Sequence, residues 1–130
     1  MPFGLQSDIP DHALPDALHS VLVQQTEALE ALLHYAQGTM ETLRATGDMS
    51  PQEQTTRVDG LAKEVSERLI ALEDQHRQIQ THLEEFQQLL RQQGNPILAP
   101  TVERVKEVLV MNFMAARQQL DAILHGQSSE

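Results

Sequence analysis

Apolar residues recur at every seventh position along the middle of the chain. Two such rows, offset by four residues, consist of Val58, Val65, Leu72, Ile79 and Phe86, and of Ala62, Leu69, His76, Leu83 and Leu90. Nine of these ten residues are apolar. This pattern is typical of a helix that packs in a coiled coil, so it predicts one long helix over residues 51–93.

Turn and cap residues mark both ends of this helix. Ser50 fits the N-cap, Pro51 fits the first helical position, and Glu53 completes a capping box. Gly47 is predicted to end the preceding helix in the left-handed conformation. Gly94-Asn95-Pro96 ends the long helix itself.

Shorter apolar stripes predict a helix on each side, over residues 14–46 and 101–125. Their rows are Leu22, Leu29, Ala36 and Leu43 in the first, and Val102, Leu109, Ala116 and Ile123 in the second. Pro15 limits the start of the first helix, and Pro100 fits the first turn of the last. Between Val108 and Ala116 nearly every helical face is apolar, so this segment should contact both other helices or a second chain.

The fold class that follows is all-α: an antiparallel, coiled-coil-like bundle of three long amphipathic helices in one domain, 1–130. Residues 47–50 and 94–100 are the expected loops, and 1–9 and 127–130 are expected to be mobile tails. The middle helix exceeds its neighbours by about 15 to 25 Å. Part of its apolar seam would then lack cover, which favours self-association, most simply as a homodimer.

Composition restricts the partners. The formal net charge is −10, and residues 1–56 hold eight carboxylates against Arg44 alone. Such a chain repels nucleic acid and anionic membranes and favours a basic or apolar protein partner. It has no cysteine, no signal-peptide pattern and no apolar run near 20 residues, so a cytoplasmic protein without membrane insertion is expected.

Two groups of residues have metal-ligand spacing. One helical face could hold His12, Asp16 and His19, which would offer two imidazoles and a carboxylate to a metal. Pro15 interrupts that face, and the alternative is that these are ordinary polar residues on a frayed N-terminal turn. Glu73 and His76 form a Glu-x-x-His pair, but a di-iron bundle needs two such pairs and two further Glu. No nucleophile elbow, P-loop or dinucleotide fingerprint is present. We therefore expect no enzyme activity, cofactor or metal.

His76 also stands out as the polar member of the seam. A polar side chain in such a position fixes the register of the helices at some cost in stability. Protonation would place a charge there, so acid could loosen the bundle. A plain hydrogen-bonded structural histidine is the alternative.

Five residues of the last helix are candidates for partner binding: Val108, Met111, Phe113, Met114 and Leu120. Flexible methionine side chains adapt to several partner shapes, and a loosely packed last helix could act as a lid. The alternative is that all five are ordinary core residues.

These features predict a non-enzymatic adaptor that binds a partner's amphipathic helix through its exposed seam and last helix. The small, acidic, helical chain with an amphipathic C-terminal helix is similar to export chaperones of flagellar and type III secretion systems. That resemblance implies a client protein as partner. A structural homo-oligomeric scaffold is the alternative, and a dimeric metal-binding bundle a more remote one.

Overall fold

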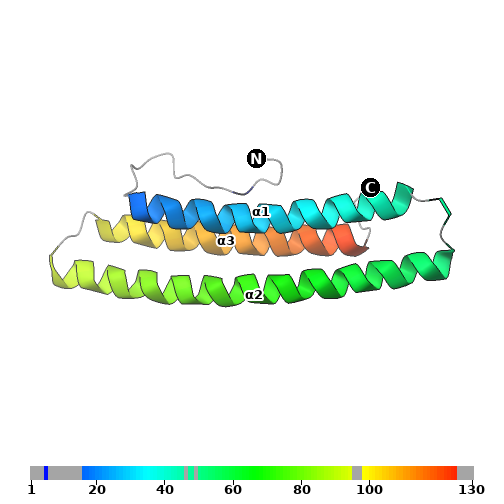
Figure 1. Cartoon of the computed structure of the whole chain (residues 1–130). Coiled ribbons are helices and arrows are strands. Elements are labelled where there is room, and N and C mark those ends of the chain that lie inside the picture. Colours follow the sequence, from blue (N-terminus) through cyan, green and yellow to red (C-terminus); the bar gives the residue numbers. More distant parts are fainter. Residues whose placement is uncertain (1–4, 6–15, 46, 49, 95–97, 126–130) are drawn as a thin grey trace.

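The protein folds into three helices, seen in the computed structural model as one elongated bundle (Figure 1). The structure describes residues 5, 16–45, 47–48, 50–94 and 98–125. Helix α1 spans Asp16–Ala45, α2 spans Pro51–Gln92 and α3 spans Leu98–His125. The described part of the chain contains no strand, which confirms the all-α bundle.

Both predicted ends of α2 are confirmed. The Ser50 hydroxyl accepts a hydrogen bond of 3.1 Å from the backbone N–H of Glu53. At the other end Gly94 has a φ of 73°, and its N–H donates to the carbonyl of Arg91. The prediction for Gly47 was wrong, because Gly94 is the only described glycine with a positive φ.

The third helix begins three residues earlier than predicted, at Leu98 instead of Thr101. Pro100 then occupies the third position of the helix. This is tolerated because the N–H groups of the first turn have no helical partner in any case. The predicted loop 94–100 is correspondingly shorter, and its residues 95–97 lie outside the described part of the chain.

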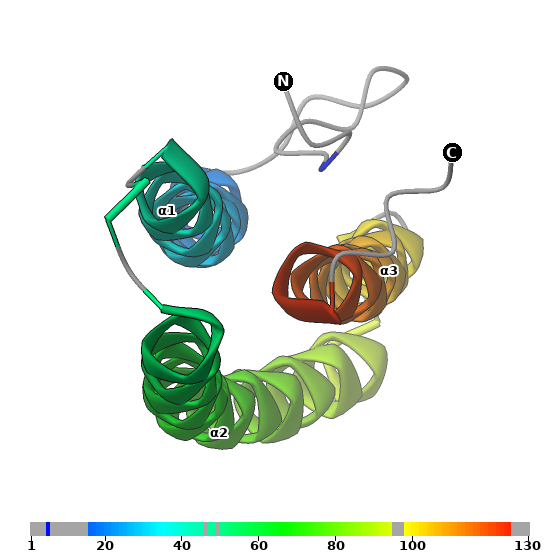
Figure 2. The ribbon, with the colours of Figure 1, turned by 90° about the vertical axis from the view of Figure 1, so that its right-hand side faces the viewer.

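The helices run up, down and up, so that α1 and α3 are parallel to each other and antiparallel to α2 (Figure 1). Viewed along the bundle, the start of α2 lies beneath α1 and its end lies beneath α3 (Figure 2). All three pairs of helices are in contact. The predicted segment from Val108 to Ala116 contacts both other helices, through Asn112 with Thr26 of α1 and through Phe113 with His76 of α2. Within the described residues, no helix combines the length and hydropathy that a membrane span requires.

The apolar core is divided into two clusters along the bundle. The first joins the second halves of α1 and α3 to the start of α2, through residues such as Leu33, Val65 and Phe113. The second joins the first halves of α1 and α3 to the end of α2, through Leu22 and Leu83 among others. The helices are held mainly by this aliphatic burial, worth about 1.5–3 kcal/mol for each fully buried side chain.

The seam of α2 deviates from strict seven-residue spacing at two places. Leu61 is buried where Ala62 was predicted, and Gln87 is buried where Phe86 was predicted. Phe86 is 36% exposed. An α-helix drifts by roughly 20° per heptad against a seven-residue row. The row that starts at Val58 has therefore rotated off the buried face when it reaches Phe86.

Incomplete cover of α2 is found mainly in its middle. No residue between Val65 and Leu83 is buried, and Leu69, Leu72 and Ile79 are only half-buried. At its start, where α2 extends past the end of α3 (Figure 1), residues 51–57 are polar, apart from the capping Pro51, and tolerate water. Although α2 has 42 residues and is the longest helix, its extra length therefore exposes fewer apolar seam residues than the length alone suggests.

Leu5 does not fit the predicted mobile N-terminal tail. Its side chain is 2% exposed and belongs to the first core cluster, because burial of a leucine holds it against the apolar surface. The remaining residues of the two predicted tails, 1–4, 6–9 and 127–130, lie outside the described residues.

Candidate groove between the second and third helices

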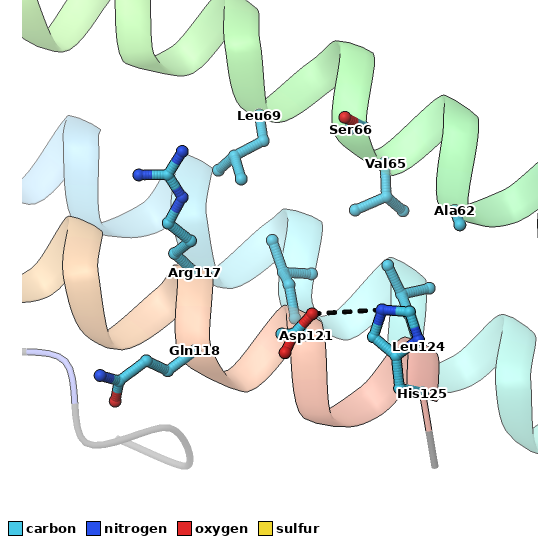
Figure 3. Close-up of a pocket in the computed structure, with 10 residues that line it drawn as sticks. Ala62, Val65, Ser66, Leu69, Arg117, Gln118, Asp121, Leu124 and His125 are labelled. Atoms are coloured by element: carbon cyan, nitrogen blue, oxygen red, sulfur yellow. Dashed lines mark ion pairs between the residues drawn. The ribbon is translucent and has the colours of Figure 1, made fainter. Parts of the chain in front are cut away.

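A groove of about 530 Å³ runs between the first half of α2 and the end of α3 (Figure 3). Its apolar lining comes from Ala62, Val65 and Leu69 of α2 and from Leu120 and Leu124 of α3. Val65 and Leu120 are fully packed core residues, whereas Leu69 and Leu124 are half-buried. The groove therefore has a buried apolar floor and half-buried apolar walls.

Polar side chains form the rim of the groove. They are Ser66 on α2 and Arg117, Gln118, Asp121 and His125 on α3. Nε2 of His125 lies 3.2 Å from Oδ1 of Asp121, one turn earlier on the same helix.

The serine, histidine and aspartate on the rim are not arranged as a catalytic triad. In Figure 3 the Ser66 hydroxyl points away from His125. The side chains of His125 and Asp121 are 61% and 68% exposed, so water surrounds both. A base activates a nucleophile when the two side chains are within hydrogen-bond reach of each other in a site that excludes water.

The five predicted partner-binding residues divide into two sets. Val108, Phe113 and Leu120 are buried in the core of this chain. Met111 and Met114 are 56% and 57% exposed, and Val110, which is not in the predicted set, is also exposed beside them. Of the predicted set, only Met111 and Met114 are exposed on the surface, whereas the buried Leu120 lines the bottom of the groove.

His76 lies half-buried on the inner side of α2. Its ring stacks on Phe113 of α3, with 5.2 Å between the ring centroids and an interplanar angle of 29°. Burial lowers the pKa of His76 below its ordinary value, while the nearby carboxylate of Glu73 acts in the opposite direction. The folded state therefore favours the neutral imidazole more strongly than the unfolded chain does.

A polar cluster ties the start of α3 to the end of α2. The buried Gln87 amide donates to the Ala99 carbonyl at 3.2 Å and to Oε1 of Glu103 at 3.1 Å. Nζ of Lys106 lies 3.8 Å from Glu84 and 3.7 Å from Glu103. Helix α3 also contributes buried residues to both core clusters, so it packs against the other helices in both halves of the bundle.

A second cluster, on the opposite side of α2, joins it to α1. The Tyr35 hydroxyl donates to Oε1 of Glu64 at 2.8 Å, and the Arg68 guanidinium lies 4.6 Å from the centre of the Tyr35 ring. Arg68 also pairs with Glu64 at 2.8 Å. This contact joins residues 29 positions apart, and no sequence signal identifies it.

The two sets with metal-ligand spacing can be compared with the structure only at their described residues. Among the described residues there is no group of three or more His, Cys, Asp or Glu that could hold a metal ion. His12 lies outside the described residues, so the set with Asp16 and His19 is described only in part. His76 faces Phe113, and the Glu73 carboxylate lies 3.8 Å from Arg77.

Comparisons with known proteins give no family assignment. No family model, curated protein or solved structure matches this chain. The groove between α2 and α3, with its apolar floor and charged rim, is therefore the main guide to function.

Proposed function

We propose that this chain is a non-enzymatic interaction protein whose α2–α3 groove binds an amphipathic helix of a partner protein. The observation that carries the proposal is the groove itself. It combines a packed apolar floor of Val65 and Leu120 with half-exposed walls of Leu69 and Leu124. Grooves of this kind receive the apolar face of a helix.

The size of the groove defines the ligand. Its α2 side extends from Ala62 to Leu69, about 10 Å or two helical turns. A bound helix would place three or four apolar side chains there, at positions i, i+3 or i+4, and i+7. Extended or proline-rich peptides lack such a row and fit the groove less well.

Charge defines the flanks of that helix. Helix α2 carries eight carboxylates and five basic residues, and the whole chain has a net charge of −10. Lysine or arginine beside the apolar stripe of the partner would favour encounter and orientation. The same field opposes nucleic acid and anionic membranes. The role is that of an adaptor or export-chaperone-like protein, acting in the cytoplasm.

The test is the binding of a fluorescently labelled cationic amphipathic peptide with leucine at i, i+3, i+4 and i+7, followed by anisotropy. We expect saturable binding that a peptide of the same composition in scrambled order does not reproduce. Ala62→Arg places a large cation in the groove and should weaken binding by about tenfold or more.

Ala71→Arg is the matched control. It introduces the same side chain on the same helix, but in the smaller groove that α2 forms with α1. We expect it to leave the affinity within about twofold. An equal loss of affinity in the two variants would show that the peptide is attracted by net charge alone, and would overturn the proposed groove. Equal binding of the scrambled peptide would overturn it too.

A further inference from the structure

The outer side of α3 carries a ridge of exposed residues centred on methionine. Val110, Met111 and Met114 are all exposed, and they are neighbours at i+3 and i+4 on the helix surface. Their exposure places them away from the buried face of α3, which includes Val105, Leu109 and Ala116. An apolar group of this kind, rimmed by charge, marks an interaction site more often than isolated apolar residues do.

The charges along this ridge follow a specific order. Six exposed residues follow one another along the ridge at steps of three or four positions: Arg104, Glu107, Met111, Met114, Arg117 and Asp121. Their sequence is basic, acidic, apolar, apolar, basic, acidic. Reading the ridge backwards exchanges the sign of each charge and keeps the methionines in the centre.

We propose that a second copy of this chain packs on the ridge, with its α3 antiparallel to that of the first. Reversal places Glu107 opposite Arg117 of the second copy, and Met111 opposite its Met114. Arg104 then comes near Asp121 of the second copy. The contact is isologous, because the two-fold axis near residue 112 makes each pair occur twice.

The charge distribution of the bundle supports a second copy as occupant. Helix α3 has three acidic and three basic residues, whereas α2 carries an excess of carboxylates. Two copies of an acidic protein therefore repel one another least when they meet through α3. A contact between two single helices is small, so the dimer belongs to the weak class, with a Kd on the order of 10–100 µM.

This inference does not rest on the proposed function. The ridge is centred on Met111 and Met114, whereas the floor of the groove is formed by Val65 and Leu120. Arg117 and Asp121 belong to the rim of the groove as well, so the two surfaces adjoin. Self-association is measured without any peptide, and its outcome is separate from that of the peptide titration.

The first experiment is sedimentation equilibrium of the whole chain from about 10 µM to about 1 mM. We expect the wild-type protein to change from monomer to dimer in this range. Met114→Asp should weaken the dimer by about tenfold or more. Ile70→Asp is the matched control, since Ile70 on α2 is 60% exposed and Met114 is 57% exposed, and it should leave the dimer intact.

The second experiment exchanges charges. Glu107→Arg and Arg117→Glu should each abolish self-association, because each places like charges opposite one another twice in the dimer. An equimolar mixture of the two variants should form a heterodimer, since every pair is then again of opposite sign. Helical circular dichroism of each variant shows that the bundle is still folded.

A wild-type chain that stays monomeric at about 1 mM would overturn the proposal. Equal loss of the dimer in Met114→Asp and Ile70→Asp would do so too. Failure of the charge-exchange mixture to dimerise, with both variants folded, excludes the antiparallel pairing.

Discussion

Nδ2 of Asn112 on α3 donates a hydrogen bond of 3.2 Å to Oγ1 of Thr26 on α1, inside the bundle. Thr26 in turn donates to the Leu22 carbonyl at 2.8 Å. Both residues are buried. They lie at the boundary between the two core clusters, Asn112 between Leu109 and Phe113 on α3 and Thr26 between Leu22 and Leu29 on α1. A buried polar pair of this kind favours one register of α1 against α3.

Thr26→Val should destabilise the protein by about 1–3 kcal/mol, because the buried Asn112 amide loses this acceptor. Urea unfolding followed by circular dichroism measures the change. Thr42→Val is the control: its hydroxyl makes the same local bond, to Gly38, on the exposed side of α1. Its cost should be within about 0.5 kcal/mol of zero. Similar costs at both positions would contradict a structural role for the pair.

Acid should weaken the bundle through His76. Its folded-state pKa lies below the ordinary 6.5 because of burial, so the unfolded chain binds a proton more readily. Stability is then full above about pH 6.5, decreases as the pH falls toward the folded-state pKa, and levels off below it. We expect the free energy of unfolding of the wild type to show this decrease and that of His76→Leu to show less of it.

His82→Leu is the comparison for that experiment, since His82 is an exposed histidine on the same helix. It should retain the pH dependence of the wild type. If His76→Leu and the wild type lose stability in parallel between about pH 8 and pH 5.5, the assignment to His76 is wrong.

Tyr35 gives a direct test of the packing of α1 on α2. The hydrogen bond to Glu64 raises its pKa above 10.0, burial and the Glu64 charge add to this effect, and Arg68 opposes it. Since the chain has one Tyr and no Trp, phenolate absorbance reports on this residue alone. Glu64→Gln should move the titration down toward 10.0, and Glu67→Gln should not. An unchanged midpoint in Glu64→Gln would mean that the contact is absent in solution.

Leu5→Ala should cost about 2–4 kcal/mol, as expected for a leucine removed from a packed core. Leu89→Ala, at a leucine that is 48% exposed, should cost clearly less. Thermal unfolding of the two variants compares them under identical conditions. Equal costs would show that Leu5 is not held in the core in solution.

The sequence predicted the fold well wherever one local rule decides the outcome. Ser50 caps α2, Gly94 ends it, and the rows of Leu and Val define the buried faces. It failed where small effects accumulate. The drift between a seven-residue row and the helical repeat carries Phe86 off the seam, and the burial of Leu5 depends on contacts with residues far along the chain.

The candidate groove could be predicted only in part. Leu120 was recognised as a candidate, but its position beside Val65 and Leu69 in the groove depends on how α2 packs on α3. The bond between Thr26 and Asn112 spans 86 positions, and periodicity does not specify such a pair. Met111, Phe113 and Met114 all lie in a segment that is apolar on most faces, so the sequence pattern does not tell them apart. In the structure the two methionines are exposed and Phe113 is buried.

The most direct test of the groove is nuclear magnetic resonance of the ¹⁵N-labelled chain during titration with the cationic amphipathic peptide. We predict that amide shift changes concentrate at residues 62–69 of α2 and 117–125 of α3, the two walls of the groove. Changes centred instead on the α1–α2 side, around Ala31 and Ala71, or no change at saturating peptide, would contradict the assignment of the α2–α3 groove as the partner-binding site.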